Sequence, residues 1–139
     1  MKALIIEDDA MVRLLLKRLL TRFFPHNVLE AGDGEEGLAV VERDRPVLVF
    51  CDLYMPKLDG IGFLERLRSH AELSDIPVIA ISSAKDKDLV LKLVGLGIAD
   101  YIMKPIDLEA TYKRLERLIP ALLDKSKAER EKPAETPQS

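Results

Sequence analysis

The stretch VLVFCDLYMPKLDG, residues 47–60, decides the fold of this chain. Its first five residues are apolar, several of them β-branched or aromatic, which is typical of a strand buried on both faces in a parallel sheet. The run ends at Asp52, and the Met-Pro and Asp-Gly pairs behind it predict a turn. We therefore expect Asp52 at the carboxyl end of a central strand, where open α/β sheets form their ligand crevices. A single such aspartate more often only caps the next helix, so the neighbouring residues decide its role.

The same pattern of a short apolar run followed by polar residues recurs along the chain. Further strands are expected at residues 2–6, 27–31, 77–81 and 99–103. Apolar residues at helical spacing predict helices at residues 10–24, 35–43, 61–69, 86–96 and 107–119, the last of them kinked or ended by Pro120. Five strands that alternate with five helices favour an α/β fold, a doubly wound parallel sheet covered by helices on both faces.

Length and composition fit one domain with a charged end. The 139 residues are 47% hydrophobic, enough to bury one core without disulfides. We expect the domain at residues 1–123, because residues 124–139 hold almost nothing that could be buried. They predict a helix extension that frays into a disordered tail or linker. The formal net charge of -3 offers no basic field, so no direct binding to nucleic acid is expected.

Several classes of protein are disfavoured by the sequence. No charged and apolar leader precedes the first strand, and no apolar run approaches the length of a bilayer span, so we expect a cytoplasmic chain outside the membrane. No glycine loop ends in Gly-Lys-Ser or Gly-Lys-Thr, so no nucleotide cofactor is expected. The single cysteine, Cys51, is expected to be a core thiol rather than a metal ligand or disulfide partner. The polar face of the helix at 10–24 is basic and carries Arg13, Lys17, Arg18 and Arg22.

Acidic residues follow two of the expected strands. Glu7 and Asp8 come directly after the first strand, as Asp52 ends the third, and the carboxyl ends of parallel strands meet at one edge of a sheet. Ser82 and Lys104 follow the fourth and fifth strands at the same edge. Three neighbouring acids repel one another unless a cation joins them, and Mg²⁺ prefers oxygen ligands of this kind. The alternative is a set of solvated surface acids with no metal.

A carboxylate at such an edge has a further chemistry open to it. It can attack phosphorus and form an acyl phosphate. A metal ion and Lys104 would then neutralise charge on the phosphoryl oxygens as transfer proceeds. The hydroxyl group of Ser82 can donate a hydrogen bond to the same oxygens.

These elements together resemble the receiver domain of response regulators in two-component signalling. The resemblance covers residues 2–123 and rests on four matches in order. They are the Glu-Asp pair at 7–8, the Asp-Leu-Tyr-Met-Pro-Lys-Leu-Asp-Gly run from Asp52, Ser82 after Pro-Val-Ile-Ala-Ile, and Asp-Tyr-Ile-Met-Lys-Pro from Asp100. Each match is weak alone, but the four in order are highly specific. The resemblance implies a flavodoxin-like five-stranded sheet of order 2-1-3-4-5.

The resemblance also implies a role for each residue at the acidic edge. Asp52 would be the phosphoacceptor, Asp8 a direct ligand of Mg²⁺ (or Mn²⁺), and Glu7 an acid that holds the ion through water. The backbone carbonyl of Tyr54 would complete the protein's ligands. Lys104 would pair with the phosphoryl group.

A switch is implied next to this site. Lys104 would be joined to Pro105 by a cis peptide bond. Ser82 and Tyr101 resemble the hydroxyl and aromatic pair whose joint rearrangement reports phosphorylation. The surface that they would remodel consists of the helix at 86–96, the strand at 99–103 and the helix after Asp107. The implied partners are a sensor histidine kinase or phosphotransfer protein, a downstream output protein or domain, and a second copy in a phosphorylation-dependent homodimer.

Departures from the family pattern are modest. Ser82 stands where threonine is more frequent, which keeps the hydroxyl group and loses a methyl group. Tyr54 and Ala84 occupy the variable positions that tune the lifetime of the phosphoryl group in such domains.

Two other functions are weighed against the receiver. A phosphatase or phosphotransferase with an aspartyl nucleophile normally has a second acid two residues after the first, where this chain has Tyr54. A pseudo-receiver would act only as a protein-binding module, and the presence of every reacting group disfavours it. The sequence therefore favours a signalling receiver, which is not an enzyme beyond its own phosphoryl transfer and autodephosphorylation.

Overall fold

The computed structural model describes residues 1–83 and 87–131. Within them lie the strands β1 (Ala3–Ile6), β2 (Val28–Ala31), β3 (Leu48–Asp52), β4 (Val78–Ser82) and β5 (Asp100–Met103). The helices that alternate with them are α1 (Ala10–Thr21), α2 (Gly34–Asp44), α3 (Gly60–Ser69), α4 (Lys87–Gly95) and α5 (Leu108–Glu131). The α/β fold expected from the sequence is confirmed, with most element ends shifted by a residue or a few.

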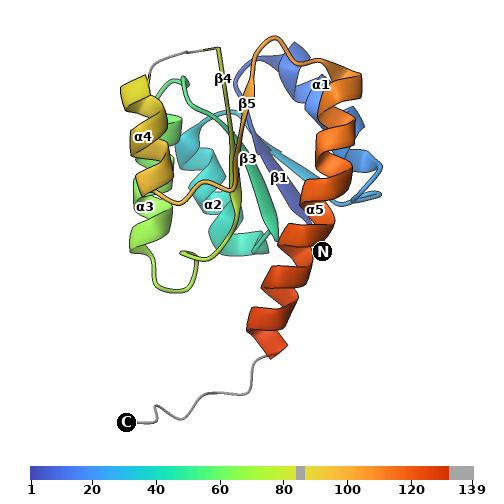
Figure 1. Ribbon diagram of the computed structural model, residues 1–139. Coiled ribbons are helices and arrows are strands. Elements are labelled where there is room, and N and C mark those ends of the chain that lie inside the picture. The colour runs from blue at the N-terminus through green and yellow to red at the C-terminus, as the bar shows by residue number, and fades with distance from the viewer. Residues whose placement is uncertain (84–86, 132–139) are drawn as a thin grey trace.

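The strands form one parallel sheet in the order β2-β1-β3-β4-β5 (Figure 1). This is the order that the resemblance implied. β3 lies in the middle, and all five of its residues are buried. The strand order reverses between β1 and β3, and in such sheets the crevice at the carboxyl ends of those strands is where ligands bind.

Helices cover both faces of the sheet, α1 and α5 on one side and α2, α3 and α4 on the other (Figure 1). Successive strand residues point to opposite faces, so each side has its own core. Phe50 of β3 belongs to the core with Leu16 of α1 and Leu115 of α5. Cys51 belongs to the opposite core with Phe63 of α3 and is fully buried, which confirms it as a core thiol.

Aspartates begin four of the helices. Asp9, Asp33, Asp59 and Asp107 precede α1, α2, α3 and α5, and the side chain of each accepts a hydrogen bond from a backbone N–H in the first helical turn. Such caps satisfy amides that have no partner inside the helix. Asp9, the third acid after β1, therefore caps a helix, as do Asp33, Asp59 and Asp107.

The C-terminal helix differs from the prediction. Of the two outcomes expected at Pro120, a kink or an end, the end is wrong, because α5 continues through Pro120 to Glu131. Proline removes the hydrogen bond to the carbonyl of Glu116, and a proline inside a helix costs about 3 kcal/mol. Leu122 and Leu123 pack against the core shared by α1 and α5, which offsets part of that cost. Even with this length, no helix in the described part of the chain is long and apolar enough to cross a bilayer.

The charged end is described only in part. Residues 124–131 continue α5, in agreement with the expected helix extension. Residues 132–139 lie outside the described residues, so the division into a domain at 1–123 and a tail at 124–139 stays a prediction.

Candidate functional site

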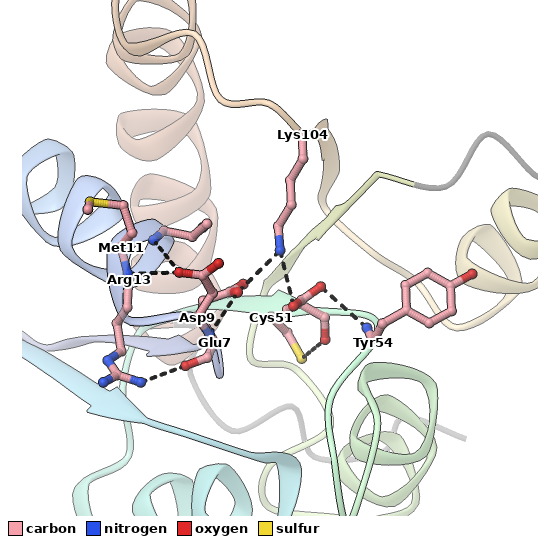
Figure 2. A network of polar contacts seen from close by, with 9 residues as sticks. Glu7, Asp9, Met11, Arg13, Cys51, Tyr54 and Lys104 are labelled. Atoms are coloured by element: carbon pink, nitrogen blue, oxygen red, sulfur yellow. Dashed lines mark hydrogen bonds and ion pairs between the residues drawn. The ribbon is translucent and has the colours of Figure 1, made fainter.

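Three of the predicted site residues meet at the carboxyl edge of the sheet. Glu7 follows β1, Asp52 ends β3, and Lys104 follows β5. The ammonium nitrogen Nζ of Lys104 lies 3.2 Å from Oε1 of Glu7 and 3.2 Å from Oδ2 of Asp52. Figure 2 shows Lys104 extended toward Glu7 from above the sheet. One lysine thus pairs with two acids that come from different strands.

The acids form a cluster of mixed exposure. Glu7 is fully buried, Asp52 is 3% exposed and Asp8 is exposed. Carboxylate oxygens of these three residues all lie within 4.8 Å of one another. The second oxygen of Glu7, Oε2, is buried without a hydrogen-bond partner among the described residues. A buried carboxylate oxygen without a partner is costly in a folded protein, and a hard cation with bound water would satisfy it.

The electrostatics of the cluster follow from this burial. Burial, and then the neighbouring charge of Asp52, raise the pKa of Glu7 to about 7, although Lys104 opposes the shift. Burial alone would lower the pKa of the Lys104 ammonium, but the charges of Glu7 and Asp52 raise it above its ordinary value. Lys104 therefore stays charged near neutral pH. An added cation would offset the repulsion between the buried carboxylates of Glu7 and Asp52.

The backbone after β3 fixes the Asp52 carboxylate. The backbone N–H of Tyr54 donates to Oδ1 of Asp52 at 3.3 Å (Figure 2). Tyr54 is 58% exposed and its ring points away from the acids (Figure 2), so its backbone rather than its side chain faces the cluster. Gly60 begins α3 against the end of β3, where an added Cβ atom would lie 2.4 Å from the carbonyl oxygen of Asp52. Only glycine allows this close approach. The metal-ligand role of the Tyr54 carbonyl stays a prediction.

The predicted switch residues border the cluster on the side of β4 and β5. Ser82 ends β4 with its side chain fully buried, and its carbonyl accepts the backbone N–H of Lys104 at 2.9 Å. The Lys104–Pro105 peptide bond is cis. Tyr101 of β5 is half-buried against the core that includes α3 and α4. Ala84, expected to tune the phosphoryl lifetime, lies outside the described residues.

Two contacts at the site were not expected from the sequence. The backbone N–H of Asp9 donates to Oε1 of Glu7 at 3.2 Å, and Nη1 of Arg13 donates to the backbone carbonyl of Glu7 at 2.8 Å (Figure 2). Helical periodicity assigns Arg13 to the basic, polar face of α1. A basic residue in the first turn of a helix that follows an acid cluster is a weak signal, and it does not show which way the side chain turns.

The fold and the site define a class of protein: a doubly wound sheet with buried acids after β1 and at the end of β3, and a lysine after β5 that bridges them. Residues 3–116 match the family model of the response regulator receiver domain. The chain belongs to this family, which is a family of signalling domains rather than classical enzymes.

Individual proteins show the same likeness. The chain is 40% identical over 117 residues to the probable C4-dicarboxylate response regulator DctR of Bacillus subtilis, covering 84% of this chain and 51% of that protein. It is 34% identical over 121 residues to the probable chemotaxis protein CheY of Rhizobium etli, covering 87% of this chain and 94% of that protein. This chain therefore spans about half the length of the first relative and nearly all of the second.

A solved structure agrees with the fold. The N-terminal domain of an uncharacterized protein from Wolinella succinogenes is similar with a TM-score of 0.79 and 33% sequence identity, covering 90% of this chain and 98% of that one. Receiver domains bind divalent metal, and the acid cluster of Glu7, Asp8 and Asp52 is a donor set of the kind that such an ion needs.

Proposed function

We propose that this chain is a phosphorelay receiver that accepts a phosphoryl group on Asp52 from a histidine kinase or phosphotransfer protein. The reaction would depend on Mg²⁺, or on Mn²⁺ in its place. The observation that carries the proposal is the position of Lys104, whose ammonium lies 3.2 Å from both Glu7 and Asp52. Lys104 thus places a positive charge beside Asp52, which is the buried aspartate of the acid cluster.

The proposed transfer is a displacement at phosphorus. An Asp52 carboxylate oxygen forms a bond to phosphorus while the bond from phosphorus to the donor's imidazole nitrogen breaks, and the imidazole leaves with the electron pair. Lys104 exchanges part of its pairing with Asp52 for pairing with the phosphoryl oxygens. Attack of water on the acyl phosphate would later restore the Asp52 carboxylate and release inorganic phosphate.

The acid cluster fits the metal on which this proposal depends. Asp8 and Asp52 would hold the ion directly, Glu7 would hold it through water, and the Tyr54 carbonyl would complete the set. The unpartnered Oε2 of Glu7 supports this assignment, because a water ligand of the ion would supply its missing hydrogen bond. When bound, the ion neutralises charge on the phosphoryl oxygens.

The signalling step would use Ser82 and Tyr101. In the proposal, the phosphoryl group draws the Ser82 hydroxyl toward it, which opens space for Tyr101 to turn inward. Because Ser82 ends β4 and Tyr101 lies on the neighbouring β5, one new hydrogen bond can bias the packing between two arrangements. The surface of α4, β5 and α5 would then differ between the two states.

The partners of the proposal follow from these roles. A sensor histidine kinase or phosphotransfer protein would supply the phosphoryl group in the cytoplasm, and an output protein or domain would read the surface of α4, β5 and α5. A phosphorylation-dependent homodimer through that surface is part of the same proposal. Val90, Leu91 and Val94 of α4 are exposed apolar side chains there, which supports a protein contact.

The alternative is a pseudo-receiver that binds partners without being phosphorylated. The contact of Lys104 with Asp52 disfavours it, since a binding module has no need for a buried acid paired with a lysine. Incubation with acetyl phosphate and Mg²⁺, followed by intact mass measurement, separates the two. We expect one phosphoryl group on the wild-type chain and none on Asp52→Asn or in excess chelator. An unlabelled wild-type chain would support the pseudo-receiver.

A further inference from the structure

The Arg13 side chain turns back from α1 toward the acid cluster. Its Nη1 donates to the backbone carbonyl of Glu7 at 2.8 Å, while its Nε lies 3.3 Å from Oε1 of Glu30 on β2 (Figure 2 shows the first contact). Lys17, one turn further along α1, lies 3.1 Å from the other oxygen of Glu30. The guanidinium is therefore held between a carboxylate on the neighbouring strand and the loop that leaves β1.

The carbonyl that Arg13 contacts belongs to the peptide group between Glu7 and Asp8. A peptide group is planar, so fixing its carbonyl also fixes the direction in which the chain enters Asp8. The peptide group before Glu7 is anchored, because the backbone N–H of Glu7 donates to the carbonyl oxygen of Ala31 at 3.0 Å. The following side is anchored because the N–H of Asp9 donates to the Glu7 carboxylate. Arg13 holds the one peptide group that lies between these two anchors.

The Asp8 side chain has no such hold of its own. It is exposed, and no hydrogen bond or ion pair to its carboxylate is present among the described residues. Its carboxylate nevertheless lies within 4.8 Å of a carboxylate oxygen of Glu7 and of Asp52. With no partner on the side chain, the backbone, which sets the direction of the Cα–Cβ bond, is what holds the Asp8 carboxylate near the other two acids.

We propose that Arg13, held by Glu30, is a positioning residue for the divalent-cation site. By fixing the peptide group between Glu7 and Asp8, it keeps the Asp8 carboxylate aimed at Asp52. Groups that orient metal ligands in this way change metal affinity about 10- to 100-fold when they are removed. The inference rests on the proposed function, because it takes the acid cluster to be the metal site of that function.

Simple electrostatics gives the opposite expectation. A positive charge near a cation site repels the cation, so removing Arg13 would tighten cation binding if charge were its only effect. If Arg13 were only a surface ion pair, its removal would change almost nothing. If Arg13 positions the Asp8 carboxylate, its removal weakens cation binding. The sign of the change in affinity therefore separates the three roles.

The experiment is a titration of the metal-free chain with Mn²⁺, in which the electron paramagnetic resonance signal of free Mn²⁺ reports binding. The variants are Arg13→Gln, Arg13→Lys and, as a matched control, Arg18→Gln. Arg18 is an exposed arginine of the same helix without a hydrogen bond or ion pair among the described residues. Amide chemical shifts of Asp8 and Asp9 in the metal-free variants give a second readout that needs no metal.

We expect Arg13→Gln to weaken Mn²⁺ binding about 10- to 100-fold and to shift the amides of Asp8 and Asp9. Arg13→Lys should fall between Arg13→Gln and the wild type, since an ammonium keeps the charge and can reach the Glu7 carbonyl but cannot also pair with Glu30 through a second nitrogen. Arg18→Gln should bind Mn²⁺ like the wild type. If Arg13→Gln does not fold, the charge-conserving Arg13→Lys decides alone.

Unchanged or tighter binding in both Arg13 variants would overturn the positioning role and leave the proposed function standing. A wild-type chain that binds no Mn²⁺ would overturn this inference and the metal dependence of the proposed function together. The two failures are thus distinguishable in one titration series.

Discussion

The ammonium of Lys104 lies 3.2 Å from the carboxylate of Asp52, although 52 residues separate them in the chain. The same ammonium contacts Glu7, which is 97 residues away. These contacts exist because parallel strands bring their carboxyl ends to one edge of the sheet. The site is therefore a product of the topology, and its charges can be tested one at a time.

Removing the lysine charge should destabilise the metal-free chain. In Lys104→Met, Glu7 and Asp52 would be buried together without a counter-charge, so we expect the free energy of unfolding to fall by about 2–4 kcal/mol at pH 8. Urea denaturation in the presence of chelator measures it. Lys113→Met is the matched control, since Lys113 pairs with Glu109 on the surface of α5 and should contribute less than about 0.5 kcal/mol. Equal losses in the two variants would contradict the pairing described for Lys104.

The raised pKa of Glu7 makes stability depend on pH. Its pKa is about 7 in the folded chain and 4.5 without the fold, so between these values the folded state binds more protons than the unfolded state. Stability of the metal-free chain should therefore fall as pH rises from about 4.5 to 7, by about 2–3 kcal/mol from this residue. Denaturation curves of wild type and Glu7→Gln across this range measure the difference.

Glu7→Gln should lack this contribution, because a neutral amide does not titrate. Saturating Mg²⁺ should reduce the fall in the wild type, since the cation favours the charged carboxylate. A difference between wild type and Glu7→Gln that stays constant with pH would show that the folded-state pKa of Glu7 is not raised.

Gly60 should tolerate no side chain. In Gly60→Ala, the added Cβ would meet the backbone of Asp52 and Leu53 at 2.4 and 2.7 Å, so either α3 or the end of β3 must move. We expect a loss of about 2–4 kcal/mol in unfolding free energy and a shifted Asp52 resonance. Gly95→Ala in α4 has nothing within 4 Å of its added Cβ and should be neutral or slightly stabilising. Comparable stability of the two variants would contradict the close approach.

Arg68 should be a stabilising link at the opposite end of the sheet. Its guanidinium donates to the carbonyls of Ser74, Ile76, Leu96 and Gly97, which joins α3 to the loops before β4 and β5. Arg68→Met leaves these carbonyls without that donor, and we expect a loss of about 2–3 kcal/mol by urea denaturation. Arg66→Met, an exposed change on the same helix, should stay within about 0.5 kcal/mol of wild type. If Arg68→Met lost no more unfolding free energy than Arg66→Met, the four hydrogen bonds of Arg68 would contribute little to stability.

Much of the fold could be predicted from residues 47–60 and the apolar runs like them. A run buried on both faces has few other interpretations, and the acids and lysine that follow such runs mark one edge of the sheet. The exact ends of helices were harder. α5 passes through Pro120 because Leu122 and Leu123 find core contacts, and no local pattern reveals tertiary contacts.

The contact that supports the acid cluster from α1 could not be predicted from the sequence, for a similar reason. The positions of Asp52 and Lys104 follow from the strands that carry them, whereas the contact of Arg13 with the Glu7 carbonyl depends on which way a long side chain turns. Periodicity assigns such a residue to a face of a helix, but it does not identify the atom that the side chain reaches.

In the proposed function, the Asp52 carboxylate becomes an acyl phosphate. Borohydride reduces an acyl phosphate to an alcohol, so treatment of the acetyl phosphate-labelled chain should convert the phosphorylated aspartate to homoserine, which peptide mass spectrometry locates. We expect homoserine at position 52 in the presence of Mg²⁺, and none there in chelator. Homoserine at Asp8 or at another acid with Asp52 unchanged, or labelling at position 52 that persists in chelator, would contradict the account.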